Sequence, residues 1–233
     1  MVREKIAEAC RKEGRAVSDV RLLPISKTVP AEILRVAQQV GMRELGENKV
    51  QEARAKAEAL ADLPIRWSVV GHLQSNKAKY VARFASEFQA LDSLKVAAAL
   101  NERLLLEGRQ MEVFVQVNTS AEGTKFGLQP EAVLPFVEAL ELYPALRPQG
   151  FMTLAVFTKD QDRVRRCFVR LREIRDRLSH QTSAGAMREL SMGMSGDYEL
   201  AIAEGATVVR VGQAIFGARA VPDSFYWPEG SAG

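Results

Sequence analysis

Lys27 is the first residue whose type and setting could support chemistry. It directly follows the apolar run 22–25 (LLPI) and precedes Pro30, a residue that suits the first turn of a helix. A lysine amine can form a Schiff base with an aldehyde, but its ordinary pKa of about 10.4 keeps it protonated at neutral pH. Burial or a neighbouring cation lowers that pKa. Lys27 is therefore either a nucleophile in a buried site or an ordinary lysine that extends into solvent.

Two glycine-containing segments near the end of the chain could bind an anion. Ser195-Gly196 and Gly212-Gln213 each stand between an apolar run and a helical pattern. Glycine lets backbone N–H groups approach an anion closely, a serine hydroxyl adds a donor, and a helix N-terminus favours negative charge. Ordinary tight turns are the alternative, and that interpretation suffices for Gly193. The pair Gly193-x-x-Gly196 is no dinucleotide-binding motif, because the third glycine and the trailing acidic residue are missing.

The elements that must position these residues alternate between two patterns. Short apolar, β-branched runs predict strands at 22–27, 43–46, 66–71, 88–91, 112–118, 149–154, 189–192 and 208–211. Helical patterns follow at 30–40, 49–60, 75–84, 94–106, 130–140, 160–178 and 196–204, and an extra helix at 2–13 precedes the first strand. Gly41, Gly108 and Gly205 stand just past helix ends, where a residue with positive φ is favoured. This alternation predicts an α/β protein with a parallel sheet.

The number of strand–helix units favours a closed barrel over an open, doubly wound sheet. The run 113–117 (VFVQV) is nearly all apolar, which is typical of parallel strands covered on both faces. Eight such units in about 200 residues match a (β/α)8 TIM barrel. We expect a single domain over residues 1–233, with a core at about 20–220 and a flexible tail at 221–233 that ends in Gly-Ser-Ala-Gly.

A barrel would bring the candidate residues together. Functional residues of this fold gather at the carboxyl ends of the strands, and a phosphate site is often built from the loops after strands seven and eight. Lys27 ends the first predicted strand, and the two glycine-containing segments follow the seventh and eighth. Strand eight closes the barrel against strand one, so Arg210 is a candidate cation near Lys27. The sequence thus predicts that a lysine and a phosphate site lie close together at the carboxyl ends of strands one, seven and eight.

Composition excludes several classes of protein. Of the 233 residues, 47% are hydrophobic and 26% charged, which is ordinary for a globular chain and excludes disordered, collagen-like and coiled-coil proteins. No apolar run approaches the ~18 residues of a membrane helix, and the charged N-terminus lacks the apolar stretch of a signal peptide. Cys10 and Cys167 are far apart in helical patterns, which suits reduced thiols. We expect a cytoplasmic protein that contacts no membrane.

The charge pattern predicts neither a nucleic-acid partner nor a metal site. The net charge is +3, and the densest basic stretch, 163–177, carries apolar residues at helical spacing. This pattern is typical of a surface helix with an arginine-rich solvated face. Two cysteines and two histidines provide no metal-ligand spacing.

Five segments, in this order, resemble the pyridoxal 5′-phosphate (PLP) homeostasis proteins. They are ISKT (25–28), LGEN (45–48) followed by VQE (50–52), GHLQSNK (71–77), LSMGMS (190–195), and VRVG (209–212) with IFG (215–217). Members of this family are single-domain relatives of the alanine racemase N-terminal barrel. The resemblance covers residues 22–219, and five motifs in order make it specific.

The resemblance assigns roles to individual residues. Lys27 matches the lysine that holds PLP as an aldimine, and Arg210 matches the arginine that faces the pyridine nitrogen. The other matches are Ser195, Gly212 and Gln213 at phosphate-binding positions, with Gly196 in the same loop as Ser195, and Asn48 and His72 at positions that line the pocket. His72 stands where other members carry proline. Lys125, in a Thr-Lys-Phe-Gly segment, matches a second basic contact.

The resemblance implies a PLP-binding protein of vitamin B6 homeostasis rather than an enzyme. An arginine beside the pyridine nitrogen disfavours protonation there and weakens the ring as an electron sink. Racemisation in alanine racemases also needs a tyrosine from a C-terminal domain, which we do not expect here. The four tyrosines, Tyr80, Tyr143, Tyr198 and Tyr226, include no evident substitute. A PLP-dependent amino-acid racemase and a phosphate-ligand barrel without PLP are the alternatives. We expect a monomer that holds PLP and delivers it to apo-enzymes.

Overall fold

The structure, a computed structural model, describes residues 1–120, 126–179 and 187–217. Its strands form one parallel sheet in the order β1-β8-β7-β6-β5-β4-β3-β2. They are β1 (Arg21–Pro24), β2 (Glu44–Glu47), β3 (Arg66–Val69), β4 (Ala85–Leu91), β5 (Met111–Gln116), β6 (Leu146–Met152), β7 (Glu189–Ser191) and β8 (Val208–Val211). An isolated bridge between Ile25 and Gly46 joins the two ends of the sheet, so the barrel is nearly closed.

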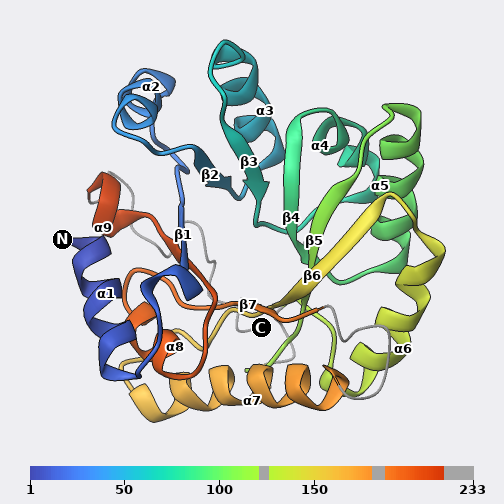
Figure 1. Cartoon of the computed structure of the whole chain (residues 1–233). Helices are drawn as coiled ribbons and strands as arrows, with labels where there is room; N and C mark the ends of the chain where they lie inside the picture. The colour runs from blue at the N-terminus through green and yellow to red at the C-terminus, as the bar shows by residue number, and fades with distance from the viewer. Residues whose placement is uncertain (121–125, 180–186, 218–233) are drawn as a thin grey trace, which may run out of the picture.

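Helices surround the strands on the outside (Figure 1). They are α1 (Val2–Lys12), α2 (Ala31–Gln39), α3 (Val50–Ala59), α4 (Ala78–Phe84), α5 (Leu94–Leu106), α6 (Val133–Ala139), α7 (Gln161–Ser179), α8 (Tyr198–Ala203) and α9 (Gln213–Phe216). The prediction of a (β/α)8 barrel with an extra N-terminal helix is confirmed. Among the helices of the described residues, none is both long and apolar enough to cross a membrane.

Several element boundaries differ from the predicted ones. β4 and β6 each begin three residues earlier than predicted, at Ala85 and Leu146. The helix predicted at 196–204 begins only at Tyr198, because Asp197 takes the N-cap position and its side chain accepts the N–H of Met194. The short helix α9 begins at Gln213, in agreement with the helical pattern predicted to start at Gly212-Gln213.

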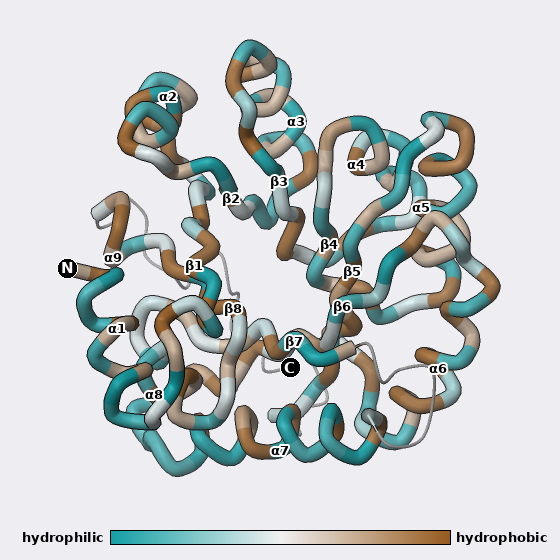
Figure 2. Tube along the Cα trace, viewed as in Figure 1, coloured by the Kyte–Doolittle hydropathy of each residue, from teal (hydrophilic) through white to brown (hydrophobic). Residues whose placement is uncertain are grey.

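α7 illustrates how the helices cover the barrel. Its buried residues Val164, Phe168 and Leu171 recur at helical spacing, and Figure 2 shows hydrophilic and hydrophobic residues alternating along it. Two of its arginines, Arg165 and Arg172, form ion pairs with Glu204, with N–O distances of 2.8 and 2.5 Å. The predicted amphipathic surface helix is therefore confirmed, and part of its basic face is paired within the chain.

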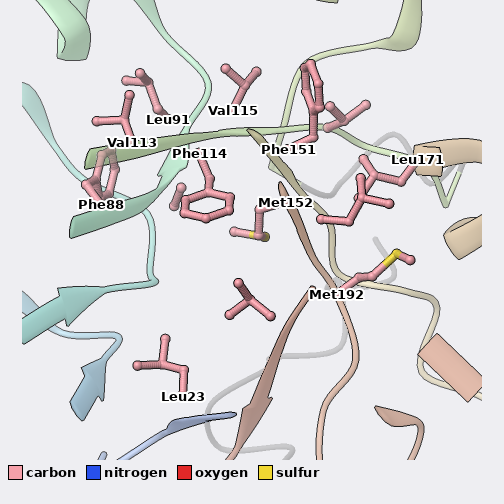
Figure 3. Close-up of a cluster of buried hydrophobic side chains, with 14 of the residues drawn as sticks. Leu23, Phe88, Leu91, Val113, Phe114, Val115, Phe151, Met152, Leu171 and Met192 are labelled. Atoms are coloured by element: carbon pink, nitrogen blue, oxygen red, sulfur yellow. The ribbon is translucent and has the colours of Figure 1, made fainter. Parts of the chain in front are cut away.

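Buried side chains fill the space between helices and strands. Phe88 of β4 and Phe151 of β6 are fully buried, and Leu171 contributes from α7 (Figure 3). Burying one such side chain contributes about 1.5–3 kcal/mol to folding. This packing fixes the strands whose carboxyl ends carry the candidate residues.

The inside of the barrel contains polar side chains that bond to one another. Arg21 Nη2 lies 2.5 Å from Glu87 Oε2, and Gln89 Nε2 donates to Glu87 Oε1 at 2.7 Å. Ser191 Oγ donates to Gln89 Oε1 at 2.6 Å. Glu87 and Gln89 belong to β4, which is separated from β1 and from β7 by other strands, so these bonds cross the inside of the barrel. A polar network therefore connects opposite walls.

Candidate functional site

Lys27 lies at the rim of the barrel, just beyond β1, and is only 9% exposed. The N–H of Ile25 donates to Val211 O and the N–H of Ser26 donates to Gly46 O, both at 2.9 Å. The chain is thus held to β8 on one side and to β2 on the other, up to the residue before Lys27. The burial that a nucleophilic lysine requires is present at this position.

Arg210 projects from β8 and is only 4% exposed. Its Nη1 donates to Ser191 Oγ at 2.6 Å, and its Nη2 donates to Thr153 O at 2.7 Å. Burial lowers the pKa of Arg210 to about 10, although the negative charges of Asp197 and Glu87 act to raise it. The guanidinium therefore stays protonated at neutral pH and is fixed at two of its nitrogens.

The register of β1 and β8 places Arg210 deeper in the barrel than Lys27. β8 pairs with β1, as predicted, and Arg210 lies opposite Leu23. Lys27 follows Leu23 by four residues, which corresponds to about 13 Å along an extended chain. The two side chains therefore start from different depths of the barrel.

The loops after β7 and β8 meet, as predicted. The N–H of Gly212 donates to Ser195 Oγ at 3.3 Å. A Cβ added to Gly196 would have no heavy atom within 4 Å, so this part of the corner is open. Ser195 and Gly196 precede α8, and α8 and α9 are short, so the available donors are individual loop groups rather than the ends of long helices. Gln213, the first residue of α9, is half-buried at this corner.

Asn48 and His72 come together in a separate part of the rim. Both line a cavity of about 460 Å³ that Lys49, Glu52 and Lys77 also border. Asn48 Oδ1 is buried, and within the described part of the chain no donor lies within hydrogen-bond reach of it. Neither Lys27 nor Arg210 lines this cavity.

His72 is exposed, and its ring stacks on Phe126 with a centroid distance of 4.1 Å. Lys125, the predicted second basic contact, lies outside the described residues, as does Tyr226.

Residues 3–220 match the protein-family model described as the N-terminal domain of alanine racemase. The chain is 39% identical over 218 residues to a pyridoxal phosphate homeostasis protein of Aquifex aeolicus, covering 94% of this chain and 95% of that protein. It is 41% identical to the protein of the same name from Pseudomonas aeruginosa, covering 94% and 93% of the two chains. This chain belongs to the pyridoxal phosphate homeostasis protein family. The resemblance read from five sequence segments is thereby confirmed.

Solved structures agree with this membership. PipY of Synechococcus elongatus PCC7942, determined with PLP bound, is 34% identical and superposes with a TM-score of 0.81, covering 91% of this chain and all of PipY. An alanine racemase of Clostridium difficile superposes with a TM-score of 0.68 at 15% identity, covering 95% of this chain and 57% of the racemase. That second likeness shows the shared fold alone.

The sequence reasoning missed the side chains that hold the candidate residues of this family member in place. Glu87 and Gln89 of β4 are at most 1% exposed, and they alternate with the buried Phe88. The sequence shows this alternation of polar and apolar residues, which is typical of a strand with a polar inner face. The predicted strand began only at Phe88 and so left out Glu87. Asp197 was also missed; its pKa is raised by burial, despite the N–H that it accepts from Met194 and the nearby charge of Arg210.

Proposed function

We propose that this chain binds PLP and serves in the intracellular homeostasis of vitamin B6. The observation that carries the proposal is the placement of Lys27, Arg210 and the Ser195–Gly212 contact on three adjacent strands of the barrel. The relatives named pyridoxal phosphate homeostasis proteins and the PLP-bound PipY structure support it.

Lys27 holds the aldehyde end of PLP in this proposal. The lone pair of the neutral Nζ attacks the aldehyde carbon, and a C=N bond replaces the C=O bond. The oxygen leaves as water together with two hydrogens, one from the amine and one supplied by solvent, and the resulting aldimine nitrogen carries the proton. The burial of Lys27 supports the neutral amine that the first step needs.

The other end of the ligand meets Arg210 and the loops after β7 and β8. Arg210, deeper in the barrel than Lys27, donates toward the pyridine nitrogen, and its fixed guanidinium keeps that nitrogen unprotonated. The phosphate accepts from the Ser195 hydroxyl and from the backbone N–H groups of Gly196, Gly212 and Gln213. Asn48 and His72 border the separate cavity at the neighbouring rim, where the buried Asn48 Oδ1 is available for a donor of the ligand.

A carrier role fits these residues better than racemisation. An unprotonated pyridine nitrogen is a weak electron sink, which disfavours carbanion chemistry. Racemisation in alanine racemases also needs a tyrosine. Of the described tyrosines, Tyr198 is buried in α8 with 4% exposure, and the Tyr80 ring packs against Arg54 and Lys79. The relatives are named for homeostasis rather than for a reaction. Delivery of PLP to apo-enzymes, a monomeric state and a cytoplasmic location stay predictions.

Borohydride trapping tests the proposal. The purified protein is incubated with PLP, its visible absorption spectrum is recorded, and the reduced product is digested and mapped by mass spectrometry. We expect a Schiff-base band and a phosphopyridoxyl group on Lys27. Lys27→Ala should lose both, whereas Lys159→Ala, which removes an exposed lysine from the β6–α7 loop, should keep both. Full covalent occupancy of the Lys27→Ala protein would overturn the assignment, and rapid conversion of L-alanine to D-alanine would favour a racemase.

A further inference from the structure

The backbone on both sides of Lys27 is held by a cluster of charged side chains from β2 and α3. The cluster consists of Glu47, Glu52 and Lys56, and Lys56 Nζ lies 2.7 Å from an oxygen of each carboxylate. Glu47 is fully buried, the Lys56 side chain is 9% exposed, and that of Glu52 is 26% exposed. The proposed function assigns no role to any of these three residues.

On the N-terminal side of Lys27, the cluster holds Ser26 by two groups. Lys56 Nζ donates to the Ser26 carbonyl oxygen at 2.7 Å. The Ser26 hydroxyl donates to Glu47 Oε1 at 2.6 Å. Both bonds are buried and both involve an ionised partner, which makes them stronger than bonds between neutral groups.

On the C-terminal side of Lys27, the cluster holds Thr28. The Thr28 N–H donates to Glu52 Oε1 at 2.6 Å. Thr28 has φ of +67°, the only positive φ among the described residues other than glycine. A β-branched residue disfavours this conformation, so the surrounding structure must impose it. The bond to Glu52 is the contact that holds the Thr28 N–H in place.

Stability alone does not explain this arrangement. Burying charged groups carries a large desolvation cost, and an apolar replacement of a buried ion pair is often neutral or stabilising. Burial indeed raises the pKa of Glu47, although Lys56 and Ser26 act in the opposite direction. A cluster that carries this desolvation cost and makes three directed bonds to the residues flanking Lys27 is suited to fixing geometry.

We propose that Glu52 and Lys56 are positioning residues that fix the backbone around Lys27 and thereby aim its amine at the aldehyde of the ligand. This inference rests on the proposed function of Lys27. Glu52 and Lys56 act through Ser26 and Thr28, and neither needs to contact the ligand. Misplacement of a reacting group by about 1 Å can slow a reaction up to about 100-fold, so modest loosening of this segment should be measurable.

Glu52→Gln is the most informative variant. It keeps the size of the side chain but removes the carboxylate charge, so the bond from the Thr28 N–H becomes a neutral one and the bond from Lys56 loses its ion pair. We expect the rate of Schiff-base formation with added PLP, followed by absorbance, to fall about tenfold. Glu58→Gln is the matched control, because it removes the same charge from the same helix, where Glu58 forms an exposed pair with Arg54. It should form the Schiff base at the wild-type rate.

The same substitution in a Lys27→Ala background separates positioning from a general structural role. Without Lys27, the covalent bond at this position cannot form, and equilibrium dialysis measures the affinity that remains. A positioning role predicts that Glu52→Gln leaves this affinity unchanged within about twofold. If Glu52→Gln weakened this affinity as much as it slows Schiff-base formation, the inference would be overturned. An unchanged rate of Schiff-base formation in Glu52→Gln with Lys27 intact would also overturn it.

Lys56→Met provides a second, independent test. It removes three bonds at once, and we expect a larger loss of Schiff-base rate than in Glu52→Gln, measured on protein shown to be folded by its thermal transition. A folded Lys56→Met protein that reacts at the wild-type rate would contradict the inference. Absence of any trapped product on wild-type Lys27 would instead refute the proposed function, so the two failures are distinguishable.

Discussion

Replacement of Ser191 by alanine should destabilise the barrel far more than its small change in volume suggests. Ser191 Oγ accepts from Arg210 Nη1 and donates to Gln89 Oε1, each at 2.6 Å. Ser191 and Gln89 are fully buried, and Arg210 is 4% exposed. The hydroxyl is therefore the link between the arginine and the polar network inside the barrel.

The magnitude follows from the two groups that lose their partner. A buried polar group left unsatisfied costs about 1–3 kcal/mol, so two such groups give about 2–6 kcal/mol. Arg210 keeps its bond to Thr153 O, and Gln89 keeps its bond to Glu87. We therefore expect Ser191→Ala to lower the free energy of unfolding by about 3 kcal/mol, in the lower half of this range. The space vacated by one hydroxyl oxygen is too small to admit a bridging water without further movement.

Urea denaturation followed by circular dichroism measures this loss directly. Ser179→Ala is the control, because the Ser179 hydroxyl donates to Asp176 O on the exposed end of α7, where we expect a change within about 0.5 kcal/mol. Adding Gln89→Leu to Ser191→Ala should cost less than the sum of the single changes, since it removes the orphaned acceptor. A loss below about 1 kcal/mol for Ser191→Ala would refute the view that Ser191 satisfies Arg210.

Two further predictions concern the rim of the barrel. Gly71→Ala should destabilise the protein by more than about 2 kcal/mol in urea denaturation, because the added Cβ would lie 2.1 Å from the Asn48 carbonyl oxygen, a backbone atom. Gly196→Ala, where the same Cβ meets open space, should change stability by less than about 0.5 kcal/mol, and an equal loss for both variants would contradict the reasoning. Ser195→Ala should weaken PLP binding about tenfold in fluorescence titrations but leave pyridoxal, which lacks the phosphate, unaffected. Equal weakening of both ligands would show that Ser195 does not contact the phosphate.

The order of strands and helices could be read from the sequence because each unit carries its own pattern. Apolar runs such as 113–117 and helical patterns such as 160–178 are local, and each predicted element is present in the structure. Boundaries were less predictable, because they depend on partners elsewhere. β4 begins at Ala85 rather than at Phe88, and the extra residues include Glu87. Its polar side chain is tolerated because Arg21 binds it across the barrel and Ser68 binds it from the neighbouring strand β3.

The sequence predicted which residues stand at the strand ends, but not how these residues are arranged in space. Lys27, Arg210, Ser195 and Gly212 were singled out from their places at strand ends, and the structure puts them on adjacent strands. Their individual roles toward a ligand stay predictions. The offset between Arg210 and Lys27 depends on the register of β1 and β8, which no local pattern encodes.

By itself, the sequence determined the barrel and the family. The strand–helix alternation depends on local periodicity, and the five motif segments are contiguous in the chain. Only the tertiary structure decided what holds the candidate residues in place. Lys56 reaches Ser26 across thirty residues of sequence, and Ser191 reaches Gln89 across more than a hundred. Buried polar groups must find partners wherever the fold brings them, and only closure of the barrel brings these residues within bonding distance.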